Sequence, residues 1–152
     1  MIKIDVFIKD KNWKKYISNP NKYLNKLAKK INLNIFSKSK SVNFSIRLTG
    51  NKEIKNLNKK FRKKNKTTDV LSFPYYDSKK IRIKLKLNKN IYLGDIVINL
   101  YKIDKRKIKF ESEFNKLWVH GLVHLLGYKH YKNKDFFKII KIENKIIKQL
   151  KC

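Results

Sequence analysis

Residues 117–131 constrain the fold of this chain more than any other stretch, because they contain all three of its histidines. His120 and His124 are four residues apart, so on an α-helix they lie on one face, about one turn from each other. Gly127 follows, and a glycine in the left-handed conformation commonly ends a helix and turns the chain. The segment therefore predicts a helix that ends near Gly127, followed by a reversal that brings His130 back towards the other imidazoles.

Three imidazoles at this spacing predict a metal site. Neutral imidazoles bind zinc, and three of them leave a fourth tetrahedral position for water, which is typical of catalytic rather than structural sites. We therefore predict one Zn2+ ion bound by His120, His124 and His130, and the same ligands also suit other divalent transition metals. The alternative is a set of histidines on the helix surface or in the core that bind no metal.

The spacing H-x3-H-x5-H also occurs in metzincin proteases. In those enzymes a glutamate directly after the first histidine acts as the general base. Here that position is Gly121. A peptidase would lack its proton acceptor, so a metalloprotease is the least favoured hypothesis.

The charge of the chain favours an anionic partner. Lys and Arg number 40 against 11 Asp and Glu, a formal charge of +29. Such an excess attracts polyanions, of which nucleic acid is the commonest. The basic residues are spread along a chain also rich in Asn and Ile, so compositional drift is an equal alternative. Arginine is rare, and a planar, bidentate donor can mark a functional position; the four arginines are Arg47, Arg62, Arg82 and Arg106.

Length and cysteine content bound the class of protein. A chain of 152 residues fits one domain, 1–152, that can bury a core without disulfides. The single cysteine is Cys152, which predicts a free thiol in a reducing compartment. The first ten residues mix charged with apolar side chains and do not resemble a signal peptide. The longest uncharged stretch near the histidines is shorter than the roughly 20 residues of a membrane span. We expect a cytoplasmic protein without membrane association.

Apolar periodicity predicts the secondary structure. Strands are expected over 2–8, 42–49, 81–87 and 91–99, with a shorter one ending at Pro74, and helices over about 20–32, 51–63 and 134–150. In the last helix we expect Phe136 and Phe137 to be buried, and Ser112 is expected to cap the histidine helix.

One glycine and two aspartates in or near the predicted strands are expected to shape the backbone or to orient another side chain. Gly94 predicts a bulge or a close backbone approach within its strand. Asp69 and Asp95 are candidates for holding an imidazole in place, and capping or turn formation is an equal alternative for each.

Three segments together resemble a known family. They are Leu57–Asn58 through Phe61–Arg62 into Thr68–Pro74, then Leu93–Ile98, then the histidine stretch, which is similar to H-G-x-x-H-L-x-G-Y-x-H. In this order they resemble the bacterial rRNA maturation factors of the YbeY type, also called UPF0054 metalloproteins, over nearly the whole chain. Lys129 stands where the family commonly has Asp, so the ligand His130 is kept while the carboxylate beside it is not.

The resemblance implies a fold and a function. The fold is α+β, a single domain with a mixed sheet of about four strands covered by helices. The implied activity is a zinc-dependent, single-strand-specific endoribonuclease, a hydrolase, acting in 16S rRNA 3′-end maturation and ribosome quality control. The resemblance also implies that Arg62 is needed for activity. Our own hypothesis for its role is that the guanidinium clamps phosphoryl oxygens bidentately.

The expected partners follow from that function. They are single-stranded RNA, rRNA and the small ribosomal subunit, with no DNA. The alternative is a non-catalytic RNA-binding ribosome-assembly factor in which the metal only stabilises the fold.

Overall fold

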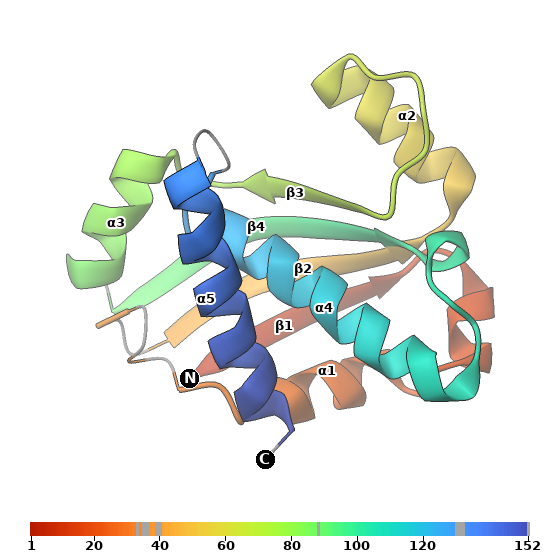
Figure 1. The fold of residues 1–152 in the computed structure, drawn as a ribbon, viewed down its shortest axis with the longest axis horizontal. Helices are drawn as coiled ribbons and strands as arrows, with labels where there is room; N and C mark the ends of the chain where they lie inside the picture. Colours follow the sequence, from red (N-terminus) through yellow and green to blue (C-terminus); the bar gives the residue numbers. More distant parts are fainter. Residues whose placement is uncertain (33, 35–36, 39–40, 88, 130–132, 152) are drawn as a thin grey trace.

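The computed structural model describes residues 1–32, 34, 37–38, 41–87, 89–129 and 133–151, so Cys152 lies outside the described residues. Within them, four strands form one mixed sheet in the order β1-β2-β4-β3 (Figure 1). The strands are β1 (Ile2–Ile8), β2 (Ser41–Thr49), β3 (Val70–Pro74) and β4 (Asn90–Asn99). The α-helices are α1 (Pro20–Ala28), α2 (Asn51–Arg62), α3 (Ser78–Leu87), α4 (Lys107–Leu125) and α5 (Asn133–Leu150). The predicted α+β fold with a four-stranded mixed sheet is confirmed.

Three of the four strands are parallel, and the edge strand β3 is antiparallel. Strands β1, β2 and β4 are parallel, and β3 runs antiparallel to β4 at one edge of the sheet. Pro74 ends β3 opposite Gly94. A proline cannot donate a backbone hydrogen bond, so the end of an edge strand is where it disturbs the sheet least.

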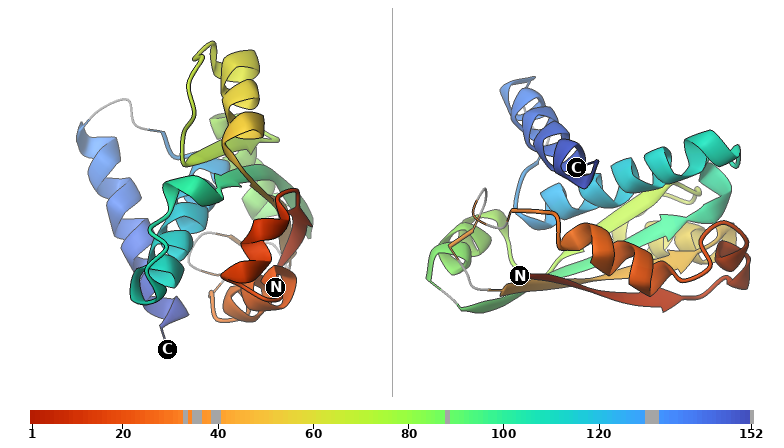
Figure 2. Two further views of the ribbon diagram at one scale, coloured as in Figure 1. Left: turned by 90° about the vertical axis from the view of Figure 1, so that its right-hand side faces the viewer. Right: turned by 90° about the horizontal axis from the view of Figure 1, so that it is seen from below.

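Helices cover the two faces of the sheet unequally. Helices α1, α4 and α5 lie on the same side of the sheet (Figure 2). The main core forms there, with Ile4, Phe44 and Ile96 of the strands packed against residues such as Trp118 and Leu122 of α4. Neighbouring strand residues alternate between the two faces. On the other side, which we call the open face, α2 packs through a small apolar cluster of Ile54, Leu71 and Val97.

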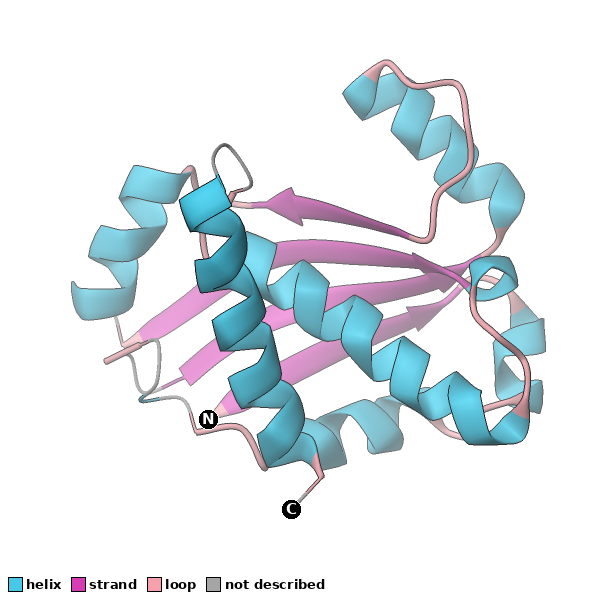
Figure 3. Ribbon diagram, viewed as in Figure 1, coloured by secondary structure: helices cyan, strands magenta, loops and turns pink. Residues whose placement is uncertain are grey.

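The strand predicted over 81–87 is instead helix α3 (Figure 3). Four apolar residues alternate with basic ones there, which fits a half-buried strand. Only Ile81 and Leu85 are buried, however, and these are four residues apart, as on one face of a helix. The carboxylate of Asp77 accepts a hydrogen bond from the backbone N–H of Lys80, at 2.8 Å, and so caps the first turn. The prediction was wrong because an alternating pattern can contain an i, i+4 pair.

The two longest helices differ from the predictions at their beginnings. Helix α4 begins at Lys107, so Ser112 lies inside it and does not cap it. In α5 the buried residues are Ile139, Ile146 and Leu150, whereas Phe136 and Phe137 are 48% and 71% exposed. Phe137 lies off the buried face of α5. Phe136 lies about one turn before Ile139, the first buried residue of this helix.

No helix in the described ranges combines the length and apolar character needed to cross a membrane.

Two glycines adopt backbone conformations that other residues rarely reach. Gly94 has a φ of +134°, and the register between β2 and β4 shifts beside it. A Cβ at this position would lie 2.3 Å from the backbone oxygen of Phe73. The predicted close approach is therefore confirmed. Gly127 has a φ of +97° directly after α4, which confirms that this glycine turns the chain at the end of the histidine helix.

We expect Gly94→Ala to lower the free energy of unfolding by about 3 kcal/mol or more. The alanine would adopt a strained φ and would also collide with backbone that the sheet holds in place. Urea denaturation measures the loss. Gly50→Ala is the matched control, because Gly50 has a φ of −130° and its added Cβ would meet only the side chains of Tyr101 and Asp10. Equal losses in the two variants would contradict the role of backbone strain.

Candidate metal centre

His120 and His124 lie on one face of α4, as their spacing predicts. Their Nε2 atoms are 3.0 Å apart. The ring centroids are 4.5 Å apart and the ring planes are inclined by 82°. The side chain of His120 is 35% exposed. The two Nε2 atoms therefore converge on one position that solvent can reach.

The other nitrogen of each ring is bound by an acceptor. Nδ1 of His120 is 2.5 Å from Oε1 of Glu143 on α5. Nδ1 of His124 is 2.8 Å from the backbone oxygen of Tyr128. A carboxylate and a carbonyl only accept hydrogen bonds, so each Nδ1 carries a proton and donates it. In the neutral rings, both Nε2 atoms then have lone pairs that face each other.

The pair fits a shared cation. Two facing lone pairs at 3.0 Å repel each other unless a proton or a metal ion compensates them. Zinc–imidazole bonds of about 2.0–2.1 Å at a tetrahedral angle place two ligand nitrogens about 3.3 Å apart, close to the observed distance. Ligand histidines also usually donate their second N–H to a carboxylate or a carbonyl, as both rings do here. The residues present therefore fit a metal ion.

The third predicted ligand, His130, lies outside the described residues, so the three-histidine site stays a prediction. In the part of the chain that the structure describes, no group of three or more His, Cys, Asp or Glu side chains could hold a metal ion. The described residues of the site are the His120–His124 pair and its two hydrogen-bond acceptors, the carboxylate of Glu143 and the backbone oxygen of Tyr128.

A side chain at the position after His120 would collide with strand β4. Helix α4 packs so tightly on β4 that a Cβ at Gly121 would lie 2.8 Å from Cγ2 of Ile96. A glutamate here would face the sheet and not the imidazoles. The general base of a metzincin protease therefore has no room at its usual place, which argues against a peptidase.

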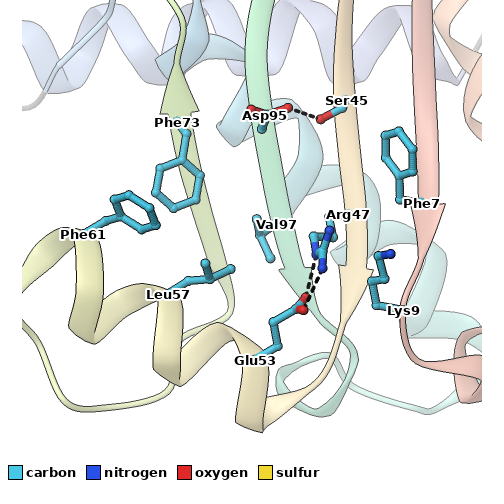
Figure 4. Close-up of a pocket in the computed structure, with 10 residues that line it drawn as sticks. All are labelled: Phe7, Lys9, Ser45, Arg47, Glu53, Leu57, Phe61, Phe73, Asp95 and Val97. Carbon is cyan, nitrogen blue, oxygen red and sulfur yellow. Dashed lines mark hydrogen bonds and ion pairs between the residues drawn. The ribbon is translucent and has the colours of Figure 1, made fainter.

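The other candidate residues lie outside the histidine helix. Arg62 is an exposed residue at the end of α2, the helix that packs on the open face. The carboxylate of Asp95 also faces that side, where it accepts hydrogen bonds from the hydroxyls of Ser45 (Figure 4) and Tyr92. Asp69 is exposed, and its backbone oxygen accepts the N–H of Asn99 at 2.9 Å. The hydrogen bonds of both aspartates thus serve strand and turn structure.

A groove of about 690 Å³ lies between α2 and the open face (Figure 4). Phe7, Phe61 and Phe73 supply much of its apolar lining. Arg47 donates two hydrogen bonds to Glu53, at 2.7 and 2.8 Å, and this contact lowers the pKa of Glu53 from its ordinary value. The opposite charges pair within the groove, and the histidines lie on the far side of the sheet.

Glu143 is a residue of the candidate site that the sequence patterns did not reveal. It follows Ile139 by four residues and precedes Ile146 by three, and both isoleucines are buried. A carboxylate on the apolar face of a helix is unusual, and this was the available signal. The second support, the carbonyl of Tyr128, is a backbone atom and leaves no trace in the sequence.

Nearly the whole chain matches one known family. Residues 7–151 match the family described as Endoribonuclease YbeY. The chain belongs to the YbeY family. The Endoribonuclease YbeY of Pelagibacter ubique is 43% identical over 155 residues, covering 99% of this chain and 97% of that relative. The Endoribonuclease YbeY of Ehrlichia canis is 35% identical over 156 residues, covering 99% and 93%. The resemblance noted in the three sequence segments is confirmed.

A solved structure is similar in fold. The solution structure of TM1509 from Thermotoga maritima matches with a TM-score of 0.55 at 24% identity, covering 99% of this chain and 89% of the other. This likeness supports the arrangement of sheet and helices that carries the histidine pair.

We expect Glu143→Gln to weaken zinc binding about 10- to 100-fold, because a neutral amide replaces the charged acceptor that orients His120. Titration against a chromophoric chelator at neutral pH measures the affinity. Glu111→Gln is the matched control, since it removes the same charge from an exposed position on α4. If Glu143→Gln bound zinc as tightly as the unchanged protein, the carboxylate would not be supporting a metal ligand.

Proposed function

We propose that this protein is a metal-dependent endoribonuclease that cleaves single-stranded RNA. The observation that carries the proposal is the convergence of the two Nε2 atoms at 3.0 Å while each Nδ1 is bound by an acceptor. Relatives in the YbeY family bear the name endoribonuclease, which supports RNA as the substrate. The formal charge of +29 suits a polyanionic substrate.

The proposed cofactor is one zinc ion, with His120, His124 and His130 as its ligands. Zinc held by imidazoles supplies Lewis-acid chemistry, which polarises a phosphoryl oxygen and acidifies water. Glu143 and the carbonyl of Tyr128 hold two of the rings in the tautomer that keeps each Nε2 available. This support fixes both rings before substrate arrives.

Arg62 is proposed to contact a phosphate of the RNA. Arg47 and Arg106 are paired with carboxylates, whereas Arg62 forms no hydrogen bond or ion pair with the described residues. A planar guanidinium binds phosphoryl oxygens bidentately and stabilises the negative charge that collects on them. Helix α2 runs beside the edge strand β3 (Figure 1). An RNA strand that crosses this edge would contact both Arg62 and the side of the sheet that carries the histidines.

In the cell, we assign this activity to ribosome maturation in the cytoplasm. The proposed substrate is the 3′ end of 16S rRNA in the small ribosomal subunit, and the proposed wider role is ribosome quality control. Support comes from the similarity of three segments to YbeY-type rRNA maturation factors and from membership of that family.

Chelation is expected to lower the rate of RNA cleavage by at least about 100-fold, and added zinc is expected to restore it. His124→Ala should lose cleavage to a similar extent, because it removes one of two converging ligands. Gel analysis of a labelled single-stranded RNA measures the rate, and a parallel binding assay should show little change. RNA that stays intact with the zinc-loaded, unchanged protein would instead favour the non-catalytic RNA-binding factor.

Arg62→Ala is expected to lower kcat/KM about 100-fold while leaving the zinc content unchanged, since a contact with a phosphate of the RNA is lost and the metal ligands are not touched. Arg62→Lys keeps the charge without the planar fork and should recover only part of the rate. Lys59→Ala, one turn earlier on α2 and also exposed, is the control for net charge. Elemental analysis runs alongside, and loss of zinc in Arg62→Ala would contradict the proposed role.

A further inference from the structure

A basic groove lies between α3 and α5, next to the histidine pair. Three hollows of about 360, 200 and 450 Å³ adjoin one another, and all three are lined by Arg82 of α3 and by Tyr128. Helix α3 and the N-terminal part of α5 lie at the same end of the sheet (Figure 1). We call the joined hollows the α3–α5 groove.

Charge distinguishes this groove from the one on the open face. Its lining has a single described carboxylate, that of Asp135, and six cationic side chains: Lys38, Arg82, Lys86, Lys129, Lys138 and Lys141. The groove on the open face has two cations and two carboxylates, so its charges balance. The six cations face a concave surface with one carboxylate among them, so their positive potential attracts an anionic ligand into the α3–α5 groove.

The cations face the groove from both helices. Arg82 and Lys86 are four residues apart on α3, and Lys138 and Lys141 are three apart on α5, so each pair shares a helix face. Arg82 is exposed and forms no hydrogen bond or ion pair with the described residues. Its guanidinium can therefore bind two oxygens of one phosphate.

We propose that the α3–α5 groove binds the phosphate backbone of single-stranded RNA and leads the strand to the histidine pair. Tyr128 makes the connection, because it lines the groove and its backbone oxygen accepts the Nδ1–H of His124 at 2.8 Å. A strand in the groove thus lies against the residue that orients His124. The tyrosine ring is half-buried against the core, and its exposed part could contact a base. The identification of the ligand as RNA rests on the proposed function. Its identification as a polyanion rests only on the charges that line the groove.

The test compares two triple charge reversals that change the net charge equally, by −6 from the formal +29. The groove variant combines Arg82→Glu, Lys86→Glu and Lys141→Glu. The control combines Lys14→Glu, Lys15→Glu and Lys22→Glu, which alter exposed lysines that line none of the three hollows. Fluorescence anisotropy with a labelled single-stranded RNA measures affinity over a series of salt concentrations. Chelator is present throughout, so cleavage does not affect the result.

The groove variant is expected to bind RNA about 10- to 100-fold more weakly, with the slope of log affinity against log salt reduced by about 2–3. The control should lose less than about threefold. Arg82→Gln alone should reduce the slope by about 1, and it provides a milder variant if the triple reversal disturbs folding. Equal losses in the two triples would overturn the proposal, because net charge alone would then explain binding.

Two further results separate this proposal from its alternatives. Polyglutamate at an equal concentration of charges should fail to displace the RNA, and efficient displacement would overturn the proposal in favour of an acidic protein ligand. If the unchanged protein bound RNA through the groove but never cleaved it, the proposed function would fail while the groove would stand.

Discussion

Helix α4 lies so close to strand β4 that a Cβ at position 121 would collide with the side chain of Ile96. This contact with Ile96 fixes the rotation of the helix about its axis. With residue 121 against the sheet and Leu122 and Val123 buried beside it, His120 faces α5, and His124 lies next to it on the helix. The imidazoles are therefore placed by a rigid, buried element, and their convergence does not require a loop to become ordered.

Helix α5 supplies the second half of this arrangement. Ile139, Ile146 and Leu150 anchor it in the core, and Glu143 between them binds Nδ1 of His120. The Glu143 side chain is only 23% exposed, so it has lost much of its contact with water. An apolar residue of similar size would often stabilise a helix interface at least as well as such a pair. The partial loss of hydration makes a carboxylate at this position unfavourable for stability. The presence of Glu143 is therefore better explained by its orientation of the His120 ring.

Local chemistry explains which features could be predicted from the sequence. Strands β1 and β2 alternate cleanly, and Gly94 and Gly127 have positive φ angles that glycine reaches without strain. Helix α3 was mistaken for a strand because its two buried residues were embedded in an alternating pattern, and burial depends on neighbours distant in the chain. The hydrogen bond between His120 and Glu143 joins residues 23 positions apart on two helices. The spacing of residues within one helix could therefore not reveal it. The place of Arg62 was equally hidden, since it depends on which face of the sheet α2 covers.

The two faces of the sheet differ in how their charges are compensated. Parallel strands are usually covered on both faces, but here α2 covers the open face only in part, and Arg47 and Asp95 there have local partners. Paired charges largely cancel at a distance, so the long-range field arises mainly from lysines and arginines without carboxylate partners. That field attracts any polyanion and weakens with salt. Holding a phosphate at a defined place needs a concave surface and a planar donor as well. Arg82 in the α3–α5 groove provides both next to Tyr128, so the general charge can concentrate RNA while the groove selects the position at which it meets the histidines.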